Sequence, residues 1–186
     1  SSGGGGGTDT SRIVNMSVRS VSGTGDNALN VGMVVGGTGS KDLLIRVVGP
    51  TLGDLGVTGV VTDPRLELFQ SQGGNSVPLA DNDNWNGDGT LSTLFDRLGA
   101  FALSSNLDAA MASSLDTGVY PVLVDTKGSS GVVLVEAYDT EDVSSGSARL
   151  VNVSARSQVG TGGDVLVAGF VISGTGTKTV LIRGVG

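Results

Sequence analysis

One segment of this chain occurs twice. Residues 12–49 and residues 149–186 align without a gap, and more than half of the paired positions are identical. The distance between the copies is too long for a solenoid coil and suits a whole small domain. A segment of about 40 residues rarely forms a sufficient core alone. The second copy therefore needs a partner, which is either the first module of the same chain or a neighbouring chain that accepts its strands.

The composition favours short strands joined by tight turns. Of 186 residues, 32 are glycine and only 4% are aromatic, while 38% are hydrophobic, which is enough for a buried core. Valine and threonine are abundant, and both favour strands. We expect an all-β fold, an antiparallel β-sandwich of jelly-roll-like type with one or two short helical turns.

Each copy contains three apolar runs separated by glycine-rich turns. The first run, which begins at residue 14 in the first copy, alternates apolar and polar residues as a half-buried strand does. The second and third runs, residues 28–35 and 43–48, are apolar on both faces and are typical of central strands. Each copy is therefore predicted to form a three-stranded meander.

Three parts of the chain follow from this pattern. Residues 1–11 are rich in Gly and Ser and are expected to be a flexible segment, because these residues offer no side chains to pack. Residues 12–147 are expected to form the β-sandwich module, and residues 148–186 a partial second repeat. Within the module, apolar spacing predicts a helical turn or two at residues 91–102 and another at residues 106–113.

Several classes of function are disfavoured. The chain has no Cys and no His, which excludes thiol nucleophiles, imidazole bases, the usual zinc sites and disulfides. Paired carboxylates such as Asp81 and Asp88 are the remaining catalytic option, as in glycoside hydrolysis, but nothing else supports it. We therefore expect a non-enzymatic protein. A net charge of −7 argues against nucleic acid, and no apolar run reaches the ~20 residues needed for membrane insertion.

Charge is divided between the repeated segment and the rest of the chain. Residues 12–49 carry four basic and two acidic side chains, and residues 149–186 carry four basic and one acidic. Residues 50–148, between the copies, carry fourteen acidic and three basic side chains. A solvated surface is the default explanation for part of this division. A basic segment that meets an acidic one would also favour docking and disfavour pairing of like with like.

A dense cluster of oxygen-bearing side chains surrounds the single tryptophan, Trp85. Calcium takes six to eight oxygen ligands, so a loop of this kind is a candidate calcium site, although Asp/Asn-rich turns without metal are common. We expect Trp85 to be buried under the loop as part of a small satellite core, rather than exposed as a platform for a sugar ring. The candidate ligands are Asp81, Asn82, Asp83, Asn84, Asn86 and Asp88.

Two resemblances to known families bear on location. The runs RIVNMSVRS, GTGDN, GTGSKDLLIRVVGPTLGDLGV, DPRLELF, DNDNW, LGAFAL and GVVLVEAYD together resemble a tandem module of large secreted proteins of environmental Gram-negative bacteria, over residues 12–186. Residues 63–125 are more loosely similar to the bacterial pre-peptidase C-terminal β-sandwich domain. The resemblance implies an extracellular or cell-surface β-sandwich of structural or adhesive type, and it brings no established catalysis to transfer.

These observations lead to one main hypothesis and two alternatives. The main hypothesis is a secreted structural subunit that forms a homopolymer, a head-to-tail filament or surface array, by donating the strands of its second copy to the next subunit. The alternatives are a monomeric calcium-dependent adhesion or carbohydrate-binding module for surface glycans, and a spacer in a longer stalk. The predicted subunit interface comprises Arg149, Val151, Val153, Arg156, Phe170, Ile172, Leu181, Ile182 and Arg183.

Overall fold

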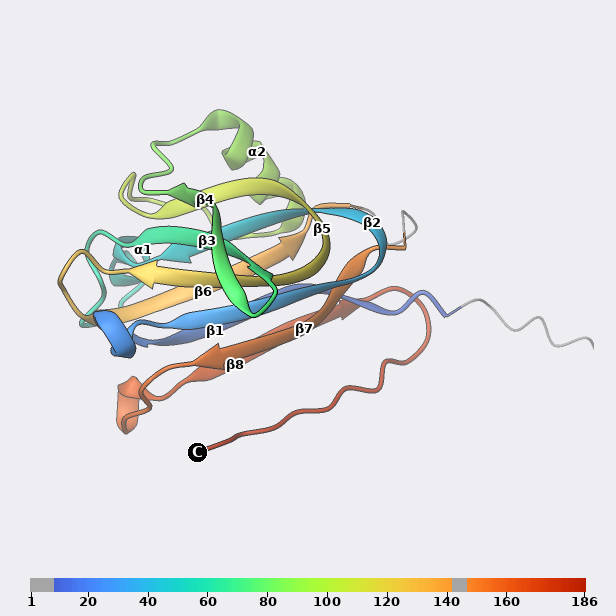
Figure 1. Ribbon diagram of the computed structural model, residues 1–186. Helices are drawn as coiled ribbons and strands as arrows, with labels where there is room; N and C mark the ends of the chain where they lie inside the picture. The colour runs from blue at the N-terminus through green and yellow to red at the C-terminus, as the bar shows by residue number, and fades with distance from the viewer. Residues whose placement is uncertain (1–8, 142–146) are drawn as a thin grey trace, which may run out of the picture.

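Antiparallel strands dominate the structure, a computed structural model that describes residues 9–141 and 147–186 (Figure 1). The all-β expectation is confirmed. In chain order the elements are β1 (Arg12–Ser22), η1 (Gly25–Asn27), β2 (Asn30–Val48), α1 (Pro50–Asp54), β3 (Arg65–Gln72), β4 (Asn75–Asn82), α2 (Gly89–Leu98), β5 (Ala109–Asp125), β6 (Gly131–Asp139), β7 (Arg149–Arg156), η2 (Gly162–Asp164) and β8 (Val167–Ser173).

The strands form a sheet that closes on itself. The order is β4-β3-β5-β2-β6-β1-β7, β8 pairs with β1, and β7 also pairs with β2. The strands β1, β6, β2 and β7 thus complete a ring, so a closed four-stranded barrel replaces the expected jelly-roll-like sandwich. The cause is the length of β2, which pairs with β7 along its first part and with β6 along its last part, and so curls the sheet back onto itself.

The predicted three-stranded meander is wrong for both copies. In the first copy the second and third runs form one 19-residue strand, β2. The glycines between them act as a bulge, because the register with β5 shifts between Val35 and Ser40 while Gly37 and Gly39 adopt φ of 99° and 88°. In the second copy, the described structure has β7 and β8 but no third strand after Ser173.

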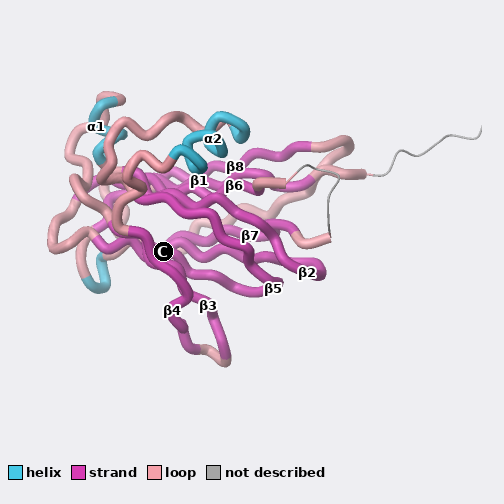
Figure 2. The backbone as a smooth tube through the Cα atoms, turned by 90° about the horizontal axis from the view of Figure 1, so that it is seen from above, coloured by secondary structure: helices cyan, strands magenta, loops and turns pink. Residues whose placement is uncertain are grey.

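Two groups of buried side chains stabilise the fold. The larger one fills the space enclosed by the strands. The smaller one includes Leu52 of α1 and Phe95 of α2. Figure 2 shows these two helices on the same side of the strands. Trp85 belongs to this smaller group: its Nε1 donates to the carbonyl of Ser105 at 2.7 Å, and its ring centroid lies 5.5 Å from that of Phe95. The predicted satellite core is confirmed.

The helical predictions differ in outcome. The helix expected near residue 91 is present as α2, where the Asp88 side chain caps the first turn and Gly99 ends the helix at a φ of 69°. The helical turn expected at residues 106–113 is wrong, because β5 begins at Ala109. Short apolar runs do not distinguish the two states, and pairing with β2 decides this one.

Candidate assembly interface

The two copies of the repeated segment pair with each other. Strand β7 of the second copy lies along the first part of β2, and β8 lies along β1. Each copy therefore uses its first strand to contact the second strand of the other. In Figure 1, β7 and β8 lie beside β1, on the side of the molecule away from α2.

This pairing is reciprocal, residue by residue. Met16 on β1 lies opposite Phe170 on β8, and the aligned residues Val153 and Met33 lie opposite each other on β7 and β2. Each of the seven residue pairs between β1 and β8 has its aligned counterpart among the seven pairs between β2 and β7. The first ladder skips Val14, and the second skips the aligned residue Val151. Equivalent residues also meet directly, since Ile13 pairs with Leu150 and the Ser20 and Ser157 hydroxyls lie 2.7 Å apart. Exchanging the two copies thus leaves the set of strand pairs between them unchanged.

The first copy is fastened to the body of the chain, which we define as residues 50–141, by a buried arginine. Arg46 is fully buried, and its Nε donates to Glu136 Oε2 at 2.9 Å while its Nη1 donates to a backbone carbonyl at 2.7 Å. Its guanidinium carbon lies 4.8 Å, 4.5 Å and 5.7 Å from the ring centroids of Phe95, Phe101 and Tyr138. We call Glu136 and these three rings the Arg46 cage.

The cage also affects the pKa of the Tyr138 hydroxyl. Its hydroxyl donates to Glu136 Oε1 at 2.8 Å. Burial, followed by the charge of Glu136, raises the pKa of Tyr138 well above its ordinary value. The hydroxyl therefore stays protonated and keeps its role as donor to the carboxylate.

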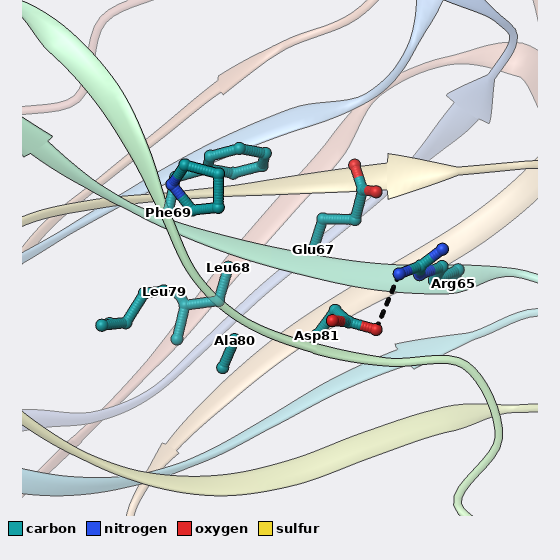
Figure 3. Close-up of a pocket in the computed structure, with 8 residues that line it drawn as sticks. Arg65, Glu67, Leu68, Phe69, Leu79, Ala80 and Asp81 are labelled. Carbon is teal, nitrogen blue, oxygen red and sulfur yellow. Dashed lines mark hydrogen bonds and ion pairs between the residues drawn. The ribbon is translucent and has the colours of Figure 1, made fainter.

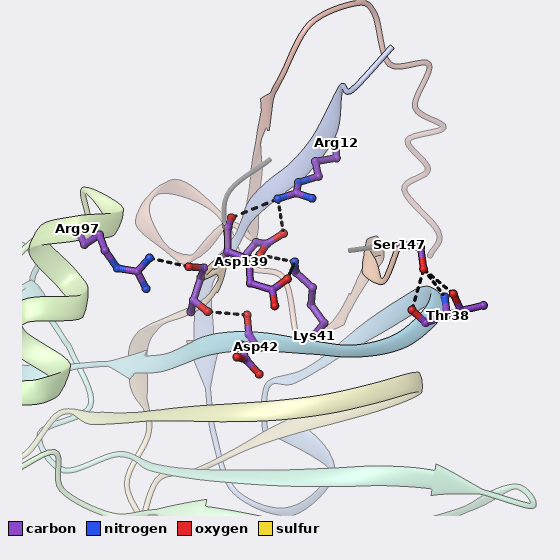
Figure 4. Close-up of polar contacts among 9 residues, drawn as sticks. Arg12, Thr38, Lys41, Asp42, Arg97, Asp139 and Ser147 are labelled. Carbon is purple, nitrogen blue, oxygen red and sulfur yellow. Dashed lines mark hydrogen bonds and ion pairs between the residues drawn. The ribbon is translucent and has the colours of Figure 1, made fainter. Parts of the chain in front are cut away.

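A second cluster of buried charge holds the middle of the first copy (Figure 4). Lys41 Nζ lies 2.7 Å from Asp139 Oδ1 and also contacts Glu141, and both the Lys41 and Asp139 side chains are fully buried. Arg12 Nη2 lies 3.7 Å from the other oxygen of Asp139. In the first copy, therefore, the basic repeat docks on acidic side chains at the end of β6, as the division of charge predicts.

The second copy carries the same side chains in an exposed setting. Of the predicted interface residues, Val153 is partly buried against the core, whereas the other eight are exposed. Leu181 and Ile182 are the extreme cases, with exposed fractions of 86% and 74%. The structure brings β7 and β8 together with the first copy but leaves residues 174–186 without a ladder.

The Asp/Asn-rich loop uses its side chains for structural contacts. Asp81 pairs with Arg65 at 2.8 Å, Asp83 pairs with Lys127 at 2.5 Å, and Asp88 caps α2. The amides of Asn82 and Asn86 both donate to the carbonyl of Asn84. In the described part of the chain no three acidic side chains gather as a metal site. Calcium binding here stays a prediction.

A small surface hollow lies between β3 and β4, beside the register shift at Leu68 (Figure 3). It encloses about 260 Å³ and is lined by Arg65, Glu67, Leu68, Phe69, Pro78, Leu79, Ala80 and Asp81. Its charged side chains are solvent-accessible, and two of them, Arg65 and Asp81, form an ion pair. The hollow offers no converging set of catalytic groups.

Asp108 is a buried carboxylate that the sequence pattern did not single out. It accepts hydrogen bonds from the backbone N–H groups of Gly49 and Thr51, at 2.8 Å and 3.3 Å, and from the Thr51 hydroxyl. These contacts fix the turn by which the chain leaves β2 and enters α1. Burial, its largest influence, raises the pKa of Asp108, while the hydrogen bonds oppose the shift.

This shift predicts a pH dependence of stability. Because the pKa is higher in the folded state, folding favours the protonated carboxyl, and the contribution of Asp108 falls as pH rises from the ordinary value of about 3.9 through the raised one. The advantage of the wild type over Asp108→Asn is therefore expected to shrink between pH 4 and pH 7. Urea unfolding of both proteins across this range measures it, and an advantage that grows with pH would contradict the assignment.

No helix in the described ranges is long and apolar enough to cross a membrane. Comparison with protein-family models, with curated proteins and with solved structures finds no match to this chain. The reciprocal pairing of the two copies is therefore the feature from which a function can be argued.

Proposed function

We propose that this protein is a non-enzymatic structural subunit that assembles head to tail, by placing β7 and β8 on the β1 and β2 strands of the next copy of the chain. We call residues 12–19 and 30–36, which receive these strands, the receptor face. The observation that carries the proposal is the reciprocal pairing, which makes the receptor face complementary to a segment that every chain contains. Donation reproduces between chains the contacts that exist within one.

Such an exchange costs little in contact energy. Within one chain β7 and β8 already satisfy the receptor face, so donation to a neighbour replaces each ladder pair by an identical one. Domain swapping of this kind is a low-cost route to assembly, because no new interface has to be built. In a head-to-tail chain of subunits, one end subunit still has free donor strands and the other still has an empty receptor face. Further subunits can therefore add at both ends and form a filament.

The connection between the body and the donated strands has the length and composition of a linker. Residues 140–148 join β6 to β7, and nine residues span at most about 30 Å when extended. Their sequence, TEDVSSGSA, is polar and contains no proline. The resemblance to a secreted tandem module supports an extracellular location for the assembly.

Cysteine cross-linking distinguishes donation between chains from pairing within one. A Cβ atom placed on Gly32 would lie 4.0 Å from Ser154 Cβ, within the range found in disulfides, and the chain has no other cysteine. One chain carries Gly32→Cys with Ser154→Ala, which gives the new side chain room, and the other carries Ser154→Cys. After the two are refolded together and oxidised, we expect a disulfide-linked dimer of the two different chains.

Each single-cysteine chain refolded alone is the control, since head-to-tail pairing then places no two cysteines opposite each other. A chain with both cysteines is expected to give a ladder of covalent oligomers in a non-reducing gel. If the mixture gives no dimer while the two-cysteine chain oxidises to a monomer, pairing stays within the chain. The monomeric adhesion module or the spacer would then be the better description.

A further inference from the structure

The last part of the second copy differs from its counterpart in the first. Residues 174–186 form no strand and are exposed, whereas the aligned residues 37–49 run into the centre of the sheet. Leu44 and Ile45 are fully buried between β5 and β6, while the identical residues Leu181 and Ile182 are 86% and 74% exposed. The same short sequence is thus core in one copy and surface in the other.

The outward sides of β7 and β8, by which we mean the sides that do not contact the first copy, show the same difference in exposure. Phe170 on β8 is 40% exposed, whereas its counterpart Met33 is 1% exposed and lies opposite Tyr120 of β5. Val159, just after β7, is exposed, whereas its counterpart Ser22 is buried where β1 pairs with β6. Within the described structure, therefore, the second copy has no strands beside it that are equivalent to β5 and β6.

The second copy also keeps the cations that recognise those strands. Arg183 aligns with Arg46, and Lys178 aligns with Lys41. In the first copy both cations are fully buried in ion pairs with Glu136 and Asp139 of β6. Burial of the two first-copy cations would be costly without these anions, so a strand with acidic side chains at the β6 positions is a suitable partner for Lys178 and Arg183 as well.

We propose that residues 177–185, together with the outward sides of β7 and β8, form a second body-docking surface, and that its occupant is the body of another copy of this chain. In that complex Arg183 replaces Arg46 in the cage and Lys178 replaces Lys41 beside Asp139. Residues 180–185 then form a strand between β5 and β6 of the acceptor. This docking uses a surface that the exchange of β7 and β8 leaves exposed.

The two copies are unequal ligands for a body. Leu43 and Val47 of the first copy correspond to Val180 and Gly184 of the second, so the first copy buries more apolar surface. This difference, together with the direct connection of the first copy to the body at Pro50, favours occupation of the body by the chain's own first copy. The second copy docks where the first copy of the acceptor is weakened or withdrawn.

The test uses an acceptor whose own segments cannot enter the cage. It carries Arg46→Glu, which faces Glu136, and Arg183→Glu, so that only a second chain can supply the arginine. Trp85 packs on Phe95 of the cage and is the sole tryptophan, so the donor carries Trp85→Phe and the fluorescence reports on the acceptor alone. On refolding with donor, we expect the folded fraction of the acceptor to rise, with its folded-to-unfolded ratio growing about tenfold per tenfold of donor once binding is saturated.

A donor with Arg183→Glu is expected to give no rescue, whereas a donor with the same charge change at Arg65, a solvent-accessible residue of the donor's own body, is expected to rescue fully. Equal rescue by the intact and Arg183→Glu donors would overturn the proposal, as would no rescue of a second acceptor with Arg46→Ala and Arg183→Ala. Cross-linking between positions 32 and 154 does not involve Arg183, so failure of this docking and failure of the strand exchange are distinguishable.

Discussion

Replacing Arg46 by alanine is expected to reduce the free energy of unfolding by about 3–5 kcal/mol, because it leaves Glu136 buried without its cation. The substitution also removes the contacts of the guanidinium with three aromatic rings, among them Phe95 and Tyr138. With a urea m-value of about 2 kcal/mol/M, the unfolding midpoint is expected to fall by about 2 M. Trp85 fluorescence follows the transition.

The repeat provides a matched control for this substitution. Arg183 occupies the aligned position in the second copy, is exposed, and belongs to no described strand. In a single chain, Arg183→Ala is therefore expected to change the free energy of unfolding by less than about 0.5 kcal/mol. Similar losses for the two variants would mean that the second copy is already docked on a body, and a small loss for both would mean that the cage contributes little.

The charge pattern of the sequence predicted that the first copy docks on the acidic part of the chain. Its other implication, that like-charged segments do not pair, is wrong, because β7 and β8 of the basic second copy pair with β2 and β1 of the basic first copy. A basic repeat and an acidic remainder imply attraction between them, and the structure places Arg46 on Glu136 and Lys41 on Asp139. The pattern could not identify these particular partners, because fourteen acidic residues lie between the copies and sequence spacing does not select among them. The pattern also could not identify the aromatic rings of the cage, since they come from three separate places in the chain: α2, the loop that follows it, and β6.

The course of β2 shows where local signals mislead. Glycines at positions 36, 37 and 39 indicate a turn, and a turn would have produced the three-stranded meander. Here Gly37 and Gly39 supply positive φ for a bulge within one continuous strand. The choice between a turn and a bulge is made by β5, which pairs with β2 on both sides of the glycines, and that pairing is a long-range property.

The reciprocal pairing was also outside the range of sequence patterns. Alternation of apolar and polar residues shows which face of β7 is buried, but it does not name the strand alongside it. Two similar segments suggest two similar environments. Instead each segment pairs with the other, and the environments differ, since β5 and β6 are present for the first copy alone within the described structure.

Deleting residues 149–186 is expected to reduce stability by several kcal/mol, an amount comparable to the whole stability of a typical domain. The deletion removes Leu150, which is buried in the larger core, and truncation of one such leucine alone costs about 2–5 kcal/mol. It also uncovers Met16 and Met33 by removing the strands beside them. Urea unfolding of the shortened chain measures the loss.

Deletion of residues 174–186 alone is the control. These residues form no strand, and their hydrogen bonds to the described part of the chain join Thr175 to Thr10 at the surface. We expect this shorter deletion to lower the free energy of unfolding by no more than about 1 kcal/mol. If the longer deletion proves equally mild, the first copy and the body close the fold without β7 and β8.

The expected result has a consequence for how assembly proceeds. If an empty receptor face costs several kcal/mol, the chain's own β7 and β8 leave only as the strands of a neighbour arrive, and folded monomers exchange slowly. When chains fold together, or at high concentration, the receptor face of each can be filled by its own β7 and β8 or by those of a neighbouring chain. Covalent dimers between positions 32 and 154 are therefore expected after joint refolding and at much lower yield after mixing of folded chains, and equal yields would show that the face opens readily.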